Sequence, residues 1–578
     1  MTLSRLRKTY YSLLFIFLTL LVASYSNLAQ GGAVLWTGPN LFYITVFLVF
    51  ASLFYLIASS RSDYYSWVEA LAIGAFCVSL FLIVWVGSGP LPFDLDSVLY
   101  MHSISFVLQN GWSSTLASSE TLLIHSPYSL PMQSMLGAAL VLVTNSSYIT
   151  VAKYLPLLLM VVFSAIYYSL VSERFGNKVS LLSLAVVASF VLVIGYANTF
   201  NNIVLGTVFF LLVLALVFMR NSRNRLAFTI LAFFVIGCFV FTHDLTVVFL
   251  IAALGVLALK DQILRIYHPE LRLRNENVMS ILLVAAVAVF AYYTFAFFGP
   301  IAAIVGAFTQ QLNIEVASAK PPSNWVLPVL VERAFFVLFI VFSIALAFFR
   351  VKADSLRFLS RYANFFLLGV AFFVFSVAGA LLKFPFNWDQ ISIYGWFFFV
   401  PVTLAMLFER GRLPIIARRG VLCSFSAVLV AALVFGNIYG GMATNLVDHT
   451  GANEYQGGAF KDWTKLSEWD AALWTIQYKQ SGSQVVGDDL VMRLYLGNSP
   501  NFTGNFTSIE SYNTTSGNSI IFIRNENSYQ IVGNFYVAAG TQPQVVNASE
   551  LTTNLLSNQS LYRVYDDGEV RMLYNPAP

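Results

Sequence analysis

The chain has little charge and almost no cysteine. Asp, Glu, Lys and Arg make up 10% of its 578 residues, while hydrophobic residues make up 58%. The mean hydropathy of +0.73 is far above what the core of a soluble protein requires. These values exclude an ordinary soluble domain. Because an ionisable group beside a bilayer is costly to desolvate, each acid or base near the apolar segments becomes a candidate for function.

Several common kinds of site are also missing. The three cysteines, Cys77, Cys238 and Cys423, all fall in apolar segments, so the sequence suggests no disulfide, zinc site or thiol nucleophile. It contains no Walker loop, no GxGxxG after a strand, no HExxH and no GxSxG. The basic residues form short clusters between apolar segments rather than one patch, which argues against nucleic-acid binding.

Long apolar runs are what the chain does have. They recur from Tyr10 to about Gly440, and a run of roughly 17 to 25 residues can cross a bilayer as a helix. We therefore expect an α-helical polytopic membrane domain, residues 1–440, with about 13 transmembrane helices. The first three spans are expected at 10–29, 41–59 and 67–87. Residues 131–143 are ambiguous, and we expect an interfacial or re-entrant helix there because a full crossing would put Arg174 and Lys178 outside.

The positions of the basic clusters predict the orientation of a multi-pass protein of the cell membrane. Arg5, Arg7 and Lys8 precede the first span, so the amino terminus is expected in the cytoplasm. Four later clusters are interpreted as cytoplasmic loops: Arg220–Arg225, Lys260–Arg274, Arg350–Arg361 and Glu409–Arg419. Residues 88–130 then form the first external loop. Residues 225–260 are expected to form a helical hairpin whose tip, Thr242 to Asp244, faces outside.

Residues 441–578 differ in composition and are expected to form an extracytoplasmic domain. They carry 7 Lys and Arg against 13 Asp and Glu, a net charge of −6, which leaves +10 for residues 1–440 of the total of +4. Five asparagines head N-x-S/T triplets there, although a region rich in Asn and Ser also produces such triplets by chance: Asn501, Asn505, Asn513, Asn547 and Asn558. The first 440 residues contain one such asparagine, Asn145.

Local patterns in this tail predict a small α/β fold. Ser467 to Asp470 resembles a capping box, and Trp469, Ala472, Leu473 and Ile476 are expected on one helical face. Ser519 to Arg524 is typical of a buried strand. Residues 561–574 are expected to form a hairpin around the Asp567-Gly568 turn.

The most informative stretch is Asp94 to Phe106, which places two acids and a histidine directly after an apolar segment. A partly desolvated carboxylate at a membrane surface can act as a general base. Asp96 is the better candidate because it opens the following amphipathic helix, and Asp94 would then orient an acceptor or a metal. The alternative for Asp96 is a helix N-cap. His102 is a candidate contact for phosphate or acceptor, or else borders an apolar stripe with Phe106.

Residues 89–112, followed by His125-Ser126-Pro127-Tyr128 and an apolar helix, resemble the first external loop of the GT-C superfamily. These are membrane glycosyltransferases that use lipid-phosphate-linked sugars, such as protein O-mannosyltransferases and aminoarabinose transferases. The resemblance implies catalysis by Asp94 or Asp96 and places His125 and Tyr128 at the mouth of the pocket. This chain departs from the pattern in having Leu95 between the acids and Ser126 in place of a proline, and it lacks the WWxxG element of oligosaccharyltransferases.

Other polar residues on the predicted external side are further candidates for substrate binding. His243 and Asp244 lie at the expected hairpin tip, although a tight turn also favours such residues. A leaving lipid phosphate calls for a cation, and Arg333 is the best candidate because a guanidinium grips phosphate in two places. Neighbouring Glu332 offers it a structural partner instead. Lys383 and Lys320 are the remaining external cations.

The expected activity is that of an integral membrane glycosyltransferase. It would move one sugar from a polyprenyl-phosphate carrier to an extracytoplasmic acceptor, a protein or a glycolipid, by an inverting displacement that needs one base. A divalent metal is left open, and no metal ligand set is assigned. Two alternatives remain: a transporter or flippase of lipid-linked glycans, which requires polar groups at mid-membrane depth, and a non-enzymatic scaffold with a glycosylated external tail.

The charge pattern makes one direct prediction about topology. A reporter protein fused after Pro578 is expected to be active only on the extracytoplasmic side, because about 13 crossings, an odd number, separate the tail from the cytoplasmic amino terminus. Fusions to a periplasmic-type phosphatase and to a cytoplasmic fluorescent protein measure this. A cytoplasmic signal would contradict the external position of both the tail and the loop at 88–130.

Overall fold

The protein is described by a computed structural model, which is mostly helical with a small sheet. The described residues are 8–9, 11–12, 15–16, 19, 41–59, 69, 95–111, 130–190, 200, 202–219, 225–267, 278–295, 326–381, 388–408, 423–434, 466–479, 483–487, 506–508, 518–524, 530–532, 544–546, 555–558, 560–566 and 570–576. Of the first three expected spans, 41–59 is confirmed as a helix, and 10–29 and 67–87 lie almost entirely outside these residues.

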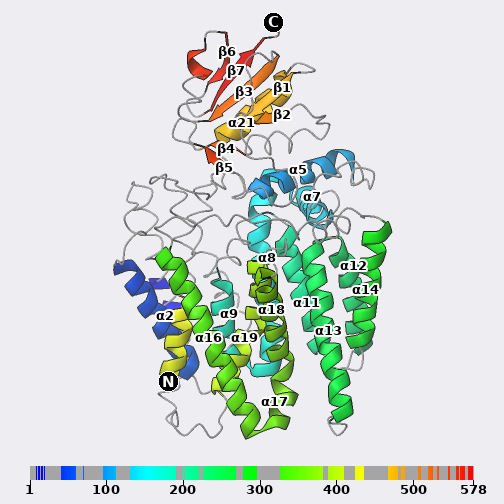
Figure 1. Ribbon diagram of the computed structural model, residues 1–578, viewed down its shortest axis with the longest axis vertical. Helices are drawn as coiled ribbons and strands as arrows, with labels where there is room; N and C mark the ends of the chain where they lie inside the picture. The colour runs from blue at the N-terminus through cyan, green and yellow to red at the C-terminus, as the bar shows by residue number, and fades with distance from the viewer. Residues whose placement is uncertain are drawn as a thin grey trace.

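Long helices run side by side to form a bundle (Figure 1). Its helices are α2 (Leu41–Ser59), α8 (Tyr148–Phe175), α9 (Asn177–Ala188), α11 (Asn202–Met219), α12 (Arg225–Val240), α13 (Asp244–Tyr267), α14 (Val278–Phe295), α16 (Val326–Ala353), α17 (Ser355–Arg361), α18 (Ala363–Leu381) and α19 (Trp388–Phe408). The helix at 423–434 follows α19. Two shorter helices, α5 (Leu95–Asn110) and α7 (Met132–Thr144), lie at the end of the bundle nearest the sheet (Figure 1).

The outward faces of the bundle suit a lipid environment. On α14, Met279, Leu283, Val287 and Phe290 are all exposed at helical spacing. Apolar stripes of this kind are rare on monomeric soluble proteins but face hydrocarbon at no cost. Among the described residues, three helices are long and apolar enough to cross a membrane, and a fourth is added if α17 and α18, bent by 74°, count as one span. The expected number of about 13 spans stays a prediction.

Close packing of aromatic rings against glycines holds the interior of the bundle together. Helices α18 and α19 approach so closely that a Cβ added to Gly395 would lie 2.9 Å from Cδ2 of Phe373, and one added to Gly369 would lie 2.8 Å from Cδ2 of Phe399. Nearby, the hydroxyls of Thr207 and Tyr394 are hydrogen-bonded at 2.9 Å. Because Gly369 and Gly395 have no side chain, helices α18 and α19 can come into direct contact.

The ambiguous segment at 131–143 is a helix too short to span a membrane. Its 13 residues in α7 measure about 20 Å, against about 30 Å of hydrocarbon.

At the far end of α8, Phe175 stacks on Tyr362, which follows α17, with ring centroids 5.9 Å apart. Arg174 therefore lies at the same end of the bundle as the basic helix α17, as the expected topology requires. Which side of the membrane this end faces stays a prediction.

Two of the clusters interpreted as loops lie on helices instead. Helix α13 continues to Tyr267, so Lys260 and Asp261 are helical and almost fully buried. Lys260 Nζ is 2.7 Å from the Asp261 carboxylate and also donates a hydrogen bond to Asn364 Oδ1. The residues 350–361 lie mostly on α16 and α17. The interpretation as a loop was wrong for Lys260 and Asp261. These charged residues remain in a buried part of the helix because they form an ion pair and Lys260 also bonds to the amide of Asn364.

The tail contains a five-stranded sheet and one long helix, α21 (Leu466–Tyr478). The strands are β1 (Gln484–Gly487), β2 (Phe506–Ser508), β3 (Ser519–Arg524), β6 (Tyr562–Asp566) and β7 (Val570–Asn575), in the order β2-β1-β3-β7-β6. Strands β2, β1 and β3 are parallel, and β3, β7 and β6 are antiparallel. A separate pair joins β4 (Gln530–Val532) and β5 (Gln544–Val546). The expected strand at 519–524 and the hairpin of β6 and β7 are confirmed.

Two local expectations for the tail helix were wrong. Helix α21 includes Leu466, so Ser467 lies in its first turn rather than at the N-cap. Leu473 is exposed, whereas Trp469 and Ala472 are buried on one side and Ala471 and Thr475 on another. The helix has two contact faces, because Ala471 packs with the sheet while Trp469 belongs to the apolar cluster of the bundle. A single apolar stripe could not predict this.

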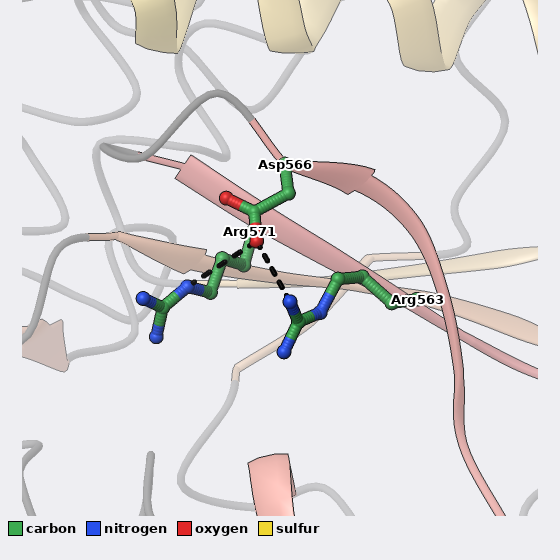
Figure 2. A network of polar contacts seen from close by, with 3 residues as sticks. All are labelled: Arg563, Asp566 and Arg571. Atoms are coloured by element: carbon green, nitrogen blue, oxygen red, sulfur yellow. Dashed lines mark hydrogen bonds and ion pairs between the residues drawn. The ribbon is translucent and has the colours of Figure 1, made fainter.

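The outer hairpin of the sheet carries a small ionic network, shown in Figure 2. The Asp566 carboxylate lies between two arginines, 3.0 Å from Nη1 of Arg563 and 3.6 Å from Nε of Arg571. All three side chains are partly exposed, so each pair contributes little to stability.

Close packing at Gly395 gives a prediction for stability. Gly395→Val is expected to lower the free energy of unfolding by about 1–3 kcal/mol, because the new side chain overlaps the Phe373 ring. Gly237→Ala is the matched control, since nothing lies within 4 Å of its added Cβ. Thermal unfolding of the purified proteins in detergent measures both. A Gly395→Val variant as stable as the parent would show that these helices do not depend on close contact.

Candidate functional site

Helix α5, which begins directly after Asp94 and includes Asp96, is the centre of the candidate site. Its buried face consists of Ser97, Tyr100, Met101 and Ile104, at the i, i+3, i+4, i+7 spacing of one helix face. The Ser97 hydroxyl accepts a hydrogen bond of 2.6 Å from the backbone N–H of Phe200, just before α11. This bond ties the first turn of α5, which includes Asp96, to the main bundle.

A second attachment joins α5 to α7. The hydroxyls of Ser103 and Ser134 are hydrogen-bonded, and both side chains are buried. One turn further along α7, a Cβ added to Gly137 would lie 2.6 Å from Cδ1 of Ile104. The isoleucine of α5 thus fills the space that the glycine leaves open, which fixes the position of α5 along α7.

The turn between α12 and α13 meets the same region. The backbone N–H of Met132, at the start of α7, donates to the carbonyl of Phe241 at 3.2 Å. His243 is 5% exposed, and its Nδ1 accepts a hydrogen bond of 3.2 Å from the backbone N–H of Thr246. His243 therefore caps α13, as the tight-turn alternative requires. A role for it in substrate binding stays a prediction.

The structure thus brings together α5, α7, the start of α11 and the turn at 241–243, which are far apart in the sequence. Asp96 and His102 lie on α5, Asp244 on α13 and Arg333 on α16, but their side chains are outside the described part of the structure. The remaining predicted site residues lie outside the described residues altogether: Asp94, His125, Tyr128 and Lys383. Their proximity to one another is untested.

Three polar residues in this region were missed in the sequence. Lys153 lies in the second turn of α8, a helix that contacts both α5 and α7, and is 6% exposed. A lysine inside an apolar span is the signal that could have found it. Gln133 on α7 is fully buried, and its amide nitrogen and oxygen have no hydrogen-bond partner among the described residues. The same holds for the amide nitrogen of Asn202 on α11.

A metal site is not visible in the described part of the chain. No group of three or more His, Cys, Asp and Glu side chains there could hold an ion. Asp94 and the side chain of Asp96 lie outside this part of the chain.

Comparison with known proteins gives similar structures but no similar sequences. No family's sequence profile and no curated protein sequence matches the chain. One similar structure is the oligosaccharyltransferase AglB of Archaeoglobus fulgidus in complex with an inhibitory peptide and a dolichol-phosphate. It has 11% identity and a TM-score of 0.48 over 76% of this chain and 64% of that one. The chain therefore spans less than two thirds of AglB.

Another similar structure is that of ArnT of Cupriavidus metallidurans bound to undecaprenyl phosphate. It has 12% identity and a TM-score of 0.46 over 86% of this chain and 97% of that one. Both are membrane glycosyltransferases of the GT-C superfamily, which the first external loop resembles.

The attachment of α5 can be tested through Ser97. Ser97→Ala leaves the buried N–H of Phe200 without its acceptor, which costs about 1–3 kcal/mol and loosens α5. Hydrogen exchange followed by mass spectrometry is expected to show faster exchange of the α5 amides. Ser105→Ala is the control, because the Ser105 hydroxyl accepts only a bond of 3.3 Å from exposed Gln109. Equal exchange in both variants would contradict a fixed α5.

Proposed function

We propose that the protein is an integral membrane glycosyltransferase. It transfers one sugar from a polyprenyl-phosphate carrier to an acceptor hydroxyl on the extracytoplasmic side, and residues 441–578 lie on that same side. Asp96 acts as general base, and Asp94 orients the acceptor. The acceptor is a protein or a glycolipid.

The observation that supports this most is the fixed position of α5. The helix that carries Asp96 lies at the sheet-facing end of an apolar bundle (Figure 1), and buried hydrogen bonds from Ser97 and Ser103 hold it there. A lipid-linked donor presents its phosphate and sugar at the surface of the bilayer. A general base must lie within hydrogen-bond reach of the proton that it takes, and a base on a rigid helix at the bilayer surface can meet this requirement.

The proposed chemistry is a single displacement at the anomeric carbon. The acceptor hydroxyl attacks this carbon, its proton passes to the Asp96 carboxylate, and the bond from carbon to the phosphate oxygen breaks. One base suffices for an inverting reaction. The leaving lipid phosphate gains charge and needs a cation. Arg333 and Lys383 are proposed for this, with Lys153 as a further candidate because its buried position lies on a helix that contacts α5.

The packing inside the bundle favours this proposal over a transporter. A transport path needs polar groups facing an aqueous route at mid-membrane depth. Two pairs of polar groups in the helix interior that the structure describes bond to one another instead. Thr403 donates to Ser343 at 2.7 Å, and Thr207 pairs with Tyr394 at 2.9 Å. The Tyr394 ring lies among those of Phe210, Phe249 and Phe372.

Replacement of the base tests the proposal. Asp96→Asn is expected to reduce sugar transfer by about 100-fold or more, the range of a lost general base, while expression and membrane insertion stay normal. The assay incubates the purified protein with a panel of polyprenyl-phosphate sugars and follows consumption of each. Asp470→Asn, an exposed acid on α21, is the control with unchanged activity.

Two results would count against it. Full transfer by Asp96→Asn would remove the proposed base, and Asp94→Asn would then decide whether the neighbouring acid takes that role. Failure to consume any donor in the panel, with the protein folded and inserted, would leave a transporter of lipid-linked glycans or a scaffold as the better account.

A further inference from the structure

The segment before the outer strand β6 presents an asparagine to solvent in a well-defined conformation. Asn558, Gln559 and Ser560 form an N-x-S triplet. On its amino-terminal side Leu555 is buried, and on the other side Leu561 packs against the same apolar cluster of the sheet. The backbone N–H of Asn558 donates to Leu555 O at 3.3 Å, and that of Leu561 donates to Asn558 O at 3.2 Å. The triplet is thus held as a tight turn.

In the side chain of Asn558, Oδ1 accepts hydrogen bonds, whereas Nδ2 is available for modification. Its Oδ1 accepts hydrogen bonds from the backbone N–H of Ser560 at 3.0 Å and from the Ser560 hydroxyl at 2.7 Å. Within the described residues its Nδ2 donates no hydrogen bond. Asn558 is partly buried and Ser560 is exposed. A group attached to Nδ2 would therefore displace no hydrogen bond seen in the structure.

The other triplets with described residues are less suitable. Asn145 is the left-handed C-cap of α7 (φ 53°), and its triplet ends at Ser147, whose hydroxyl accepts a bond from the N–H of Thr150 at 3.1 Å. The membrane-crossing helix α8 begins only three residues later. In the triplet of Asn505, Phe506 and Thr507 belong to β2, which pairs with β1.

We infer that Asn558 is a site of N-linked glycosylation on the external face of the tail. The donor is a glycan linked to a lipid phosphate, supplied to a separate transferase of the host. In the reaction a bond forms between Nδ2 and the anomeric carbon, the bond from that carbon to the phosphate oxygen breaks, and Nδ2 loses one proton to a base. The inference rests on the proposed external position of residues 441–578 and is independent of the chain's own transferase activity.

Site-resolved mass spectrometry of the full-length protein tests this inference. The protein is expressed in cells that N-glycosylate exported proteins, with a known exported glycoprotein as the reference for competent glycosylation. The peptide containing Asn558 is expected to carry a glycan, and Asn558→Gln is expected to lose it with no change in thermal unfolding. Asn145→Gln is the matched control and should change no glycan. Ser560→Ala should abolish the modification, whereas Ser560→Thr should keep it.

An unmodified Asn558 in cells where the reference protein is fully glycosylated overturns the inference, as does loss of the glycan in Asn145→Gln but not in Asn558→Gln. The Asp96→Asn variant separates the two proposals. If it loses sugar transfer but keeps the glycan on Asn558, both stand. If it keeps full transfer and Asn558 is glycosylated, only the proposed base fails.

Discussion

The hydrogen bonds that hold α5 at the end of the bundle are the constraint on which the candidate site depends. A backbone N–H that is buried without a partner costs about 1–3 kcal/mol, and Phe200 is fully buried, so that no water replaces the lost bond. The chain satisfies the N–H of Phe200 with the small hydroxyl of Ser97 and joins α5 to α7 through two serines. Because these side chains are short, the helices can approach until Ile104 fills the space at Gly137. The acid-bearing turn of α5 is positioned as a result.

Helix α21 connects this region to the tail. Trp469 and Ala472 belong to the apolar cluster of the bundle, while Ala471 belongs to that of the sheet. Thr475 also reaches the sheet, where it donates to the sulfur of Met572 at 3.2 Å. One helix is thus buried on two sides, and the sheet lies beyond the same end of the bundle as α5 (Figure 1).

The sequence was most informative where one pattern decides the outcome. The apolar run at 41–59 and the β-rich run at 519–524 both appear with the expected bounds, since each needs only local propensity and burial. Clusters of charged residues were a poorer guide to where a helix ends, because Lys260 stays within α13 by bonding to Asn364, a residue on another helix. The meeting of α5, α7 and the turn at Phe241 depends on tertiary contacts between distant segments. No periodicity contains that information, and the two faces of α21 could not be predicted from a single apolar stripe.

The buried amides in the candidate site are the feature that the stability of the fold accounts for least. Gln133 lies next to Ser134 on α7, and Asn202 begins α11 two residues after Phe200; their amide groups have unpaired atoms within the described structure. Desolvating an unpaired amide opposes folding, and a side chain chosen for packing alone would be leucine or methionine, which leave nothing unpaired. The neighbouring serines show that this region can pair its polar groups when only structure is required. Buried hydroxyls without a partner also occur elsewhere in the described bundle, at Ser183 and Ser426, but the buried amides that lack one are confined, among the described residues, to α7 and the start of α11.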